Sequence, residues 1–274
     1  MPLLTLHELE QTFPAFKGKV GHAFARFVMK VLAIDSINDL YDRYSSLQGP
    51  EFTEALLKDV GVSYEVKGVE RIGLLGDKPF ITISNHPYGG IDGIVLIDLF
   101  GHYRNDYKVI VNKFLARIEA MDMNFITVTP TGKVRSTPTR DSILGIKMAI
   151  EHARSGAPLG IFPSGAVSDL SLKDRCIRDR KWQKPIIRMI KELRLPILPV
   201  KFLDGNSLVY YLLGLIDWRV RLLKLPSELL NKRGKRVRLV IGDVITAEEQ
   251  DCFPDLDEFG NFLRHNVYQL KWEQ

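Results

Sequence analysis

The sequence predicts an α/β fold in which a mostly parallel central sheet is flanked by helices, with an N-terminal helical segment ahead of it. From residue 79 onward, short apolar runs typical of buried strands alternate with helical patterns, which favours parallel strands covered on both faces. A chain of 274 residues is long enough to bury a full core. With 45% apolar and 26% charged residues, the composition excludes both a disordered chain and an integral membrane bundle.

Residues 1–64 form the predicted N-terminal segment, in which apolar residues at steps of three and four indicate a helix. Basic residues accompany this stripe, so one interpretation is an amphipathic helix that lies in a membrane interface. Packing of the stripe on the domain core is an equal alternative, because Gly18 and Gly21 each weaken a free-standing helix by about 1 kcal/mol. The stripe consists of Phe13, Phe16, Val20, Phe24, Phe27 and Val31.

The main predicted domain, residues 65–274, contains strands and helices in alternation. One helix is especially well marked, because Asp141 can cap its start and Gly156 can end it. The apolar run 208–216 is far shorter than the ~20 residues that a membrane-spanning helix needs. The expected strands are residues 79–85, 107–111, 124–128, 158–162, 195–202 and 236–244.

The segment 83–96, ISNHPYGGIDGIVL, carries the most informative chemistry. Here an expected strand leads through a glycine pair into a helix, and α/β proteins place active sites at such strand ends. Residues six apart on one continuous helix point away from each other, so His86 and Asp92 can meet only if the chain folds back between them. Gly89 and Gly90 permit that turn, because glycine adopts backbone angles that other residues avoid.

Both residues suit general acid–base chemistry. An imidazole can take the proton of an alcohol near neutral pH, so His86 is the candidate general base and Asp92 the partner that holds the ring and stabilises its cation. N–H groups in the first turn of the new helix could stabilise an oxyanion or a phosphate. The structural alternative is a histidine satisfied by the backbone and an aspartate that only caps a helix. From the pair alone, that alternative is the more common one.

The octapeptide NHPYGGID resembles the first motif of the glycerolipid (lysophospholipid or 1-acylglycerol-3-phosphate) acyltransferase family. The usual form separates histidine and aspartate by four residues, whereas this chain has five between His86 and Asp92. That variant resembles a bacterial branch containing haemolysin-like proteins and the O-acyltransferases of ornithine- and glycine-lipid synthesis. The resemblance implies that His86 and Asp92 are catalytic and that Asn85, Gly89 and Gly90 belong to the substrate site.

Three further segments resemble family motifs in the family's order, so the resemblance covers about residues 65 to 220. In NFITVTPTGKVR, Lys133 and Arg135 suit phosphate recognition, although two basic residues in such a loop are often only solvated. FPSGAVSDL has Ser164 where the common form carries glutamate, which agrees with the haemolysin-like branch. The resemblance implies substrate-binding roles for Lys133, Arg135, Phe162, Pro163, Ser164 and Gly165, and for Pro199 in the fourth segment, LPILPV.

The resemblance implies an O-acyltransferase that moves a fatty acyl chain from acyl-CoA or acyl carrier protein to the hydroxyl of a lysophosphatidate-like or lyso-aminolipid acceptor. No further cofactor is expected, and no metal, because no second histidine or cysteine stands at ligand spacing. The main alternative is a non-catalytic lipid-binding protein on the same fold. Ser164 lacks the G-x-S-x-G context of a hydrolase nucleophile, and TGKVR has valine where a phosphate-binding loop needs serine or threonine.

Positive charge is concentrated between Lys173 and Arg194, where nine basic residues stand against three acidic ones. Such a cluster is often only a solvated helix face. The functional interpretations are an anionic membrane surface, at about 1 kcal/mol per basic residue, an acidic carrier protein or a phosphate-bearing co-substrate. Nucleic acid fits poorly, because the cluster matches no recognition motif. The distant Cys176 and Cys252 and the lack of a signal peptide indicate a cytoplasmic protein, peripheral on the inner face of the cell membrane.

Overall fold

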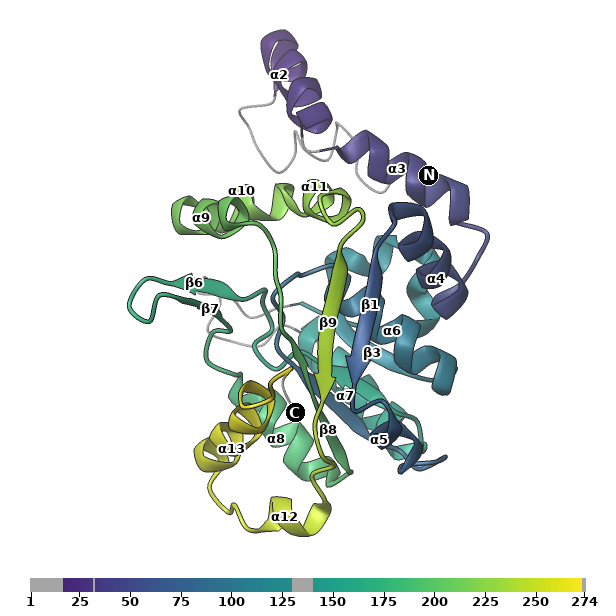
Figure 1. Cartoon of the computed structure of the whole chain (residues 1–274), viewed down its shortest axis with the longest axis vertical. Coiled ribbons are helices and arrows are strands. Elements are labelled where there is room, and N and C mark those ends of the chain that lie inside the picture. Colours follow the sequence, from purple (N-terminus) through teal and green to yellow (C-terminus); the bar gives the residue numbers. More distant parts are fainter. Residues whose placement is uncertain (1–16, 32, 130–139, 273–274) are drawn as a thin grey trace.

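A seven-stranded sheet forms the centre of the protein, with helices on both of its faces (Figure 1). The computed structural model describes residues 17–31, 33–129 and 140–272. Across the sheet the strands follow the order β1-β9-β8-β2-β5-β3-β4. Their bounds are Ser63–Lys67 (β1), Ile81–Ser84 (β2), Lys108–Asn112 (β3), Phe125–Val128 (β4), Leu159–Ile161 (β5), Ile197–Phe202 (β8) and Arg236–Ile241 (β9).

Five strands run parallel, and the two strands at one side run against them. β2 pairs in parallel with β5 and β8, and β3 pairs in parallel with β5 and β4. β9 is antiparallel to β8, and β1 is parallel to β9. The predicted α/β fold with a mostly parallel sheet is therefore confirmed. The reversal of β9 was not predicted, because a strand pattern in the sequence carries no information on direction.

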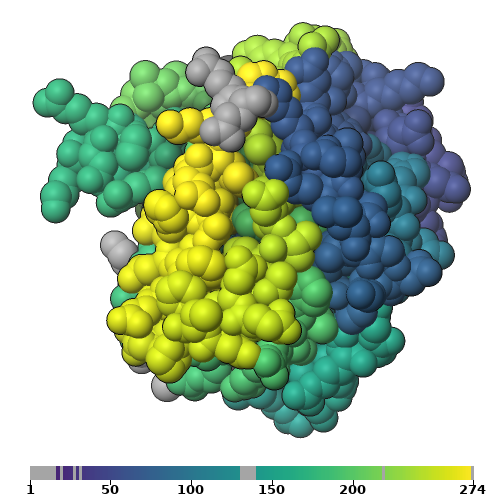
Figure 2. All heavy atoms as spheres, turned by 60° about the horizontal axis from the view of Figure 1, so that its bottom comes forward, coloured from purple at the N-terminus to yellow at the C-terminus, as the bar shows by residue number. Residues whose placement is uncertain are grey.

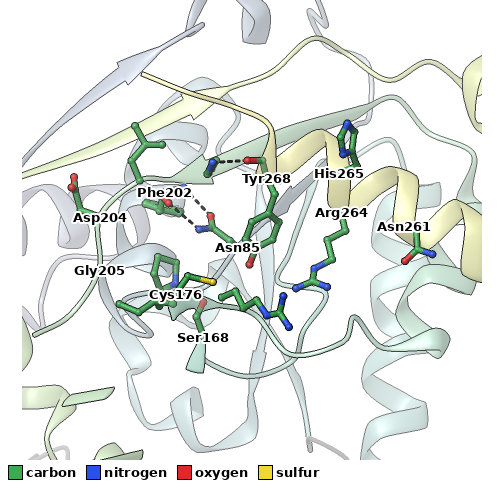
Figure 3. A pocket seen from close by; sticks show the side chains of 15 residues that line it. Asn85, Ser168, Cys176, Phe202, Asp204, Gly205, Asn261, Arg264, His265 and Tyr268 are labelled. Carbon is green, nitrogen blue, oxygen red and sulfur yellow. Dashed lines mark hydrogen bonds between the residues drawn. The ribbon is translucent and has the colours of Figure 1, made fainter. Parts of the chain in front are cut away.

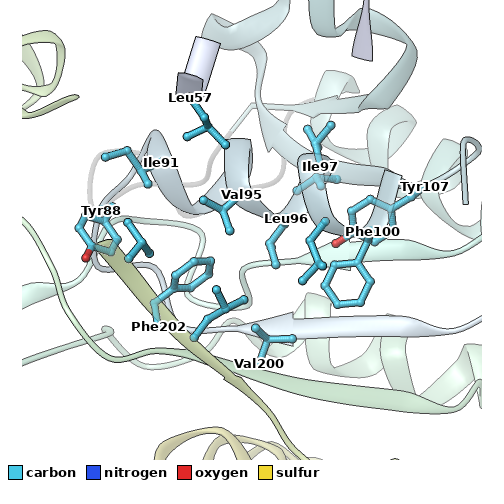
Figure 4. Packing of buried hydrophobic residues seen from close by; sticks show 14 of the residues in the cluster. Leu57, Tyr88, Ile91, Val95, Leu96, Ile97, Phe100, Tyr107, Val200 and Phe202 are labelled. Atoms are coloured by element: carbon cyan, nitrogen blue, oxygen red, sulfur yellow. The ribbon is translucent and has the colours of Figure 1, made fainter. Parts of the chain in front are cut away.

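Helices cover the two faces in separate groups, and each group encloses its own apolar core. On one face, α4 (Gly49–Val60) and α6 (Ile91–Tyr103) pack over the sheet, and the α6 side chains meet those of β8 (Figure 4). The other face is covered by α7 (Arg140–Arg154), α8 (Lys184–Leu193) and α13 (Leu256–Tyr268). This layering leaves the ends of the parallel strands as the place where loops of different elements can meet.

The register of the central strands brings two of the predicted motifs together. Ile83 in β2 lies opposite Ile161 in β5 and Pro199 in β8. Because the carboxyl ends of neighbouring parallel strands meet at the same edge of a sheet, the loops that follow Ser84 and Ile161 leave the sheet side by side. The first loop contains the NHPYGG segment and the second the FPSGAV segment.

Among the described residues, α2 (Gly18–Val31) and α3 (Ile34–Tyr44) precede α4, and there the predicted helical character is observed. Phe24 of the predicted stripe is 52% exposed. Phe13 and Phe16 of that stripe lie outside the described residues. The division of the chain near residue 64 stays a prediction.

A short hairpin and a layer of helices lie beside the strand ends. The hairpin consists of β6 (Asp169–Ser171) and β7 (Cys176–Arg178), and it projects from the body of the molecule (Figure 2). α9 (Leu208–Ile216) packs next to β6, followed by α10 (Trp218–Leu223) and α11 (Leu225–Leu230). No helix in the described part of the chain is long and apolar enough to cross a membrane. The remaining elements are α5 (Glu70–Gly73), α12 (Ala247–Asp251), and the 3-10 helices η2 (Lys113–Arg117) and η3 (Glu119–Asn124).

Candidate active site

Residues 85–90, called the His86 loop from here on, connect β2 to α6 and turn sharply at Gly89. The φ angle of Gly89 is +85°, which disfavours any residue with a Cβ. A Cβ at this position would also lie 2.9 Å from a methyl group of Val167 and 3.0 Å from one of Leu225. Gly90 has a φ of −88° and open space around it. The turn therefore depends on the first glycine of the pair far more than on the second.

Asp92, in the first turn of α6, holds the turn of the His86 loop from inside. Its side chain is fully buried, and Oδ2 accepts hydrogen bonds from the backbone N–H groups of Tyr88 and Gly89, both at 2.9 Å. The same Oδ2 lies 2.8 Å from Nδ1 of His86. The chain thus folds back between His86 and Asp92 as expected, and one carboxylate contacts both the turn and the imidazole.

The His86 ring lies against Phe162 at the start of the neighbouring loop. The two rings stack with centroids 4.0 Å apart at an interplanar angle of 28°. Nδ1 is buried and faces Asp92 at hydrogen-bond distance, but the ring N–H is poorly aligned with that oxygen, so Nδ1 has no well-formed hydrogen bond. The side chain is 15% exposed. With Nδ1 turned toward the carboxylate, Nε2 is the ring nitrogen available to a substrate.

A second buried carboxylate, Asp179, contacts the backbone of His86 and was not predicted. Oδ1 of Asp179 accepts the backbone N–H of His86 at 3.1 Å and the hydroxyl of Ser168 at 2.5 Å, and Oδ2 accepts the indole N–H of Trp182 at 3.2 Å. Burial raises the pKa of the Asp179 carboxyl above its ordinary value, and these hydrogen bonds act in the opposite direction. In the sequence, Asp179 is one acidic residue within a basic cluster, and no spacing links it to His86.

Asn85 ties the end of β2 to the end of β8. Its side-chain amide donates to the carbonyl of Phe202 at 2.9 Å, and its side-chain oxygen accepts the N–H of the same residue at 2.8 Å. Both polar groups of the Asn85 side chain are therefore hydrogen-bonded within the protein. These bonds position the His86 loop, and the substrate-binding role predicted for Asn85 stays a prediction.

Tyr211 in α9 and Asn206 just before that helix hold the other side of the His86 loop. The hydroxyl of Tyr211 donates to the carbonyl of Pro87 at 2.7 Å, and the side-chain amide of Asn206 donates to the carbonyl of Tyr88 at 2.8 Å. Tyr211 is fully buried and Asn206 is nearly so. The loop is thus fixed by contacts from β8, α9 and α6 as well as by its own turn.

Phe162 is the residue of the FPSGAV loop whose ring stacks on His86. Ser164 is buried, and its hydroxyl donates to the carbonyl of Ala166 in the same loop at 2.7 Å. The carbonyl of Pro163 accepts the backbone N–H of Gln183 at 2.9 Å. Gly165 has a φ of +63°, and a Cβ there would overlap the side chain of Gln183. Pro163, Ser164 and Gly165 therefore shape this loop, and their predicted contacts with a substrate stay predictions.

Three predicted residues remain. Lys133 and Arg135 are outside the described residues. Pro199 is buried in the middle of β8, where its carbonyl accepts the N–H of Gly242 at 2.8 Å. It lines neither of the two cavities described below, so its assignment to substrate binding stays a prediction.

A cavity of about 610 Å³ lies behind the backbone of the His86 loop (Figure 3). Asn85 and Pro87 line it, and so does Tyr268 of α13, whose hydroxyl accepts the backbone N–H of Asp179 at 2.8 Å. A second cavity, of about 450 Å³, lies beside Tyr88 and Lys232. His86 lines neither, so both cavities border the His86 loop without opening onto the imidazole.

Comparisons with known proteins show what this chain is similar to. A family model described as Acyltransferase matches residues 9–273. A lyso-glycine lipid O-acyltransferase from Bacteroides thetaiotaomicron is 27% identical over 252 residues, covering 89% of this chain and 88% of that protein. Another of the same name, from Phocaeicola vulgatus, is 27% identical over 276 residues, covering 97% and 95%. The crystal structure of the 1-acyl-sn-glycerophosphate acyltransferase PlsC from Thermotoga maritima matches with a TM-score of 0.48 and 15% identity, over 82% of this chain and 84% of that one.

Proposed function

This chain belongs to the acyltransferase family, and from that premise we propose that it transfers a fatty acyl group from an acyl thioester to the hydroxyl of a lyso-lipid, in membrane lipid biosynthesis. The observation that carries the proposal is the pairing of His86 with Asp92. The two side chains, six residues apart, meet at 2.8 Å at the end of a central strand. A general base needs a partner that fixes its ring, and this arrangement supplies one.

The proposed reaction needs one proton carrier. Nε2 of His86 takes the proton of the acceptor hydroxyl while the oxygen attacks the carbonyl carbon of the thioester. The tetrahedral intermediate then expels the thiolate, which receives the proton from the imidazolium, so that an ester and a free thiol are the products. Asp92 stabilises the imidazolium between the two steps, and its burial strengthens that interaction.

A lyso-lipid acceptor is supported by the names of two relatives, both lyso-glycine lipid O-acyltransferases that this chain matches over most of its length. The donor is proposed as acyl-CoA or acyl carrier protein, because both present the same thioester to the base. Peripheral association with the inner face of the cell membrane remains part of the proposal, since a lyso-lipid acceptor resides there.

The alternative is a non-catalytic lipid-binding protein on the same fold. One observation favours it: position 164 offers no carboxylate, and the Ser164 hydroxyl is bonded within its own loop. An intact His86 and Asp92 pair argues against it, because binding alone needs neither a base nor its partner.

A transfer assay with the purified protein separates the two functions. Radiolabelled long-chain acyl-CoA and acyl carrier protein are each supplied with lysophosphatidate, lyso-ornithine lipid or lyso-glycine lipid, and the ester product is quantified. We expect turnover with at least one pair and none from a folded His86→Ala variant. Lipid binding without turnover across the whole panel would instead favour the lipid-binding protein.

A further inference from the structure

α9 exposes a continuous aliphatic face to solvent. Leu208, Val209, Leu212, Leu215 and Ile216, named the α9 face, are 62%, 56%, 44%, 46% and 80% exposed. At 3.6 residues per turn these five side chains fall within an arc of about 120° on one side of the helix. Scattered exposed leucines are ordinary, but five on a nine-residue helix form a contiguous apolar patch of the kind that marks an interaction site.

The opposite side of α9 is fixed to the protein, so the helix cannot turn its apolar face inward. Tyr210 and Tyr211 are fully buried, and the Tyr211 hydroxyl is bonded to the carbonyl of Pro87 in the His86 loop. Gly214 faces the side chain of Arg221, which is itself buried and donates to the carboxylate of Asp169 at 2.5 Å. The α9 face therefore points away from the protein. On its inner side, the same helix holds the His86 loop through Tyr211.

The β6–β7 hairpin, which lies next to α9 (Figure 1), adds both apolar groups and positive charge. Leu172 is 68% exposed and Ile177 is 40% exposed. Lys173 and Arg175, between them in the chain, are exposed and make no ion pair with any residue that the structure describes. Exposed aliphatic side chains next to uncompensated cations suit an anionic lipid surface, where both find partners.

Several cations in the rest of the basic cluster are paired within the protein, although Arg188 on α8 is exposed and makes no ion pair with a described residue. Lys184 pairs with Asp257 at 2.5 Å, and Arg194 pairs with Asp251. These ion pairs neutralise cations of the α8 region within the protein itself. On the hairpin, Arg178 pairs with Asp174 at 2.6 Å, which leaves Lys173 and Arg175, among the described residues, as the unpaired cations beside the α9 face.

We propose that the α9 face and the tip of the β6–β7 hairpin together dock on an anionic lipid surface. Docking there places the His86 loop next to the membrane that holds a lyso-lipid. This link to the acceptor rests on the proposed function. α9 is then the layer between the lipid and the candidate base.

Vesicle binding tests the surface directly. The double variant Leu212→Ser, Ile216→Ser removes two side chains of the α9 face, and Leu144→Ser, Met148→Ser on α7 is the matched control, with residues 55% and 48% exposed. On phosphatidylglycerol vesicles we expect the α9 variant to bind at least about tenfold more weakly and the control to bind like the parent protein. Lys173→Glu, Arg175→Glu should weaken binding to phosphatidylglycerol vesicles but not the residual binding to phosphatidylcholine vesicles. Equal binding by the α9 variant and the control would overturn the proposal.

A second measurement separates this proposal from the proposed function. With a short-chain, monomeric lyso-lipid, the α9 variant should keep the parent rate, whereas with acceptor embedded in vesicles it should lose most of it. Loss of both rates would mean that the α9 face belongs to the active site, and a changed oligomeric state in size-exclusion chromatography would mean that it contacts a second copy; either overturns the docking proposal. If no variant or parent transfers acyl groups, the proposed function fails while the vesicle-binding result still decides the docking surface.

Discussion

The backbone N–H of His86 donates to the buried carboxylate of Asp179 at 3.1 Å, so two carboxylates contact the candidate base, one 2.8 Å from its ring nitrogen and one bonded to its backbone. Asp179 is also bonded to Ser168 and Trp182, and its own backbone N–H donates to the hydroxyl of Tyr268 in α13. The position of His86 is therefore coupled to α13 and to the segment that follows the β6–β7 hairpin.

Replacing Asp179 by asparagine should lower kcat with little change in KM. An amide offers one acceptor oxygen where the carboxylate offers two, so a buried N–H of His86 or Trp182 loses its partner, at about 1 to 3 kcal/mol of stability. Trp182→Phe is the control, because it removes a donor to the same carboxylate without touching the contact with His86. Steady-state kinetics beside thermal melts should show comparable destabilisation in both variants and a lowered kcat in Asp179→Asn alone. A normal kcat in a folded Asp179→Asn protein would limit this residue to a structural role.

The raised pKa of Asp179 also predicts how its contribution to stability varies with pH. Burial makes the folded state hold this proton more tightly than the unfolded chain does. The resulting stabilisation is fully present below the ordinary aspartate pKa of about 3.9 and is lost as pH rises through the folded-state pKa. The stability difference between the parent and Asp179→Asn should therefore narrow from about pH 4 toward neutrality, as measured by urea denaturation. A difference that widens over that range would contradict the direction of this shift.

The glycine pair of the His86 loop gives a matched test of the turn. Gly89→Ala should destabilise the protein by about 1 to 2 kcal/mol and lower activity, because of its positive φ and its contacts with Val167 and Leu225. Gly90→Ala should be neutral, since that residue has an ordinary φ and open space. Chemical denaturation and the transfer assay on both variants check this. Equal effects at the two positions would show that the turn tolerates a side chain.

Two adjacent buried tyrosines in α9 should differ in how loss of the hydroxyl changes the stability of the protein. Tyr211→Phe removes the bonds to Pro87 and to the N–H of Asn206, and should cost about 1 to 3 kcal/mol. The hydroxyl of Tyr210 is buried without a hydrogen-bond partner in the described structure, so Tyr210→Phe should be neutral or stabilising. Thermal melts distinguish the pair. Similar losses would mean that the two hydroxyls have similar surroundings.

Local patterns were enough to predict most of the fold. The strands around residues 79–85 and 195–202 and the helix from Asp141 follow from apolar runs and capping signals, and all were observed. The direction of β9 was not predictable, because the alternation of side chains is the same in either direction.

In the candidate site, contacts between residues close in sequence were predictable and contacts between distant residues were not. The meeting of His86 and Asp92 was predictable, because glycines mark a turn between two residues close in sequence. Asp179 is 93 positions from His86 and reaches it only through tertiary packing, so no local spacing indicated the contact. The bonds between Asn85 and Phe202 were not predictable either, because these residues are 117 positions apart.

The central claim is that His86 and Asp92 act as one unit in acyl transfer, and the most direct test is the transfer rate of three folded variants. His86→Ala should lower the rate by roughly 10² to 10⁴, Asp92→Asn should remove most of it, and the double variant should be little worse than His86→Ala. Because Asp92 also holds the turn through Tyr88 and Gly89, thermal melts must confirm that each protein is folded at the assay temperature. A folded His86→Ala protein that transfers acyl groups at nearly the parent rate would contradict the claim.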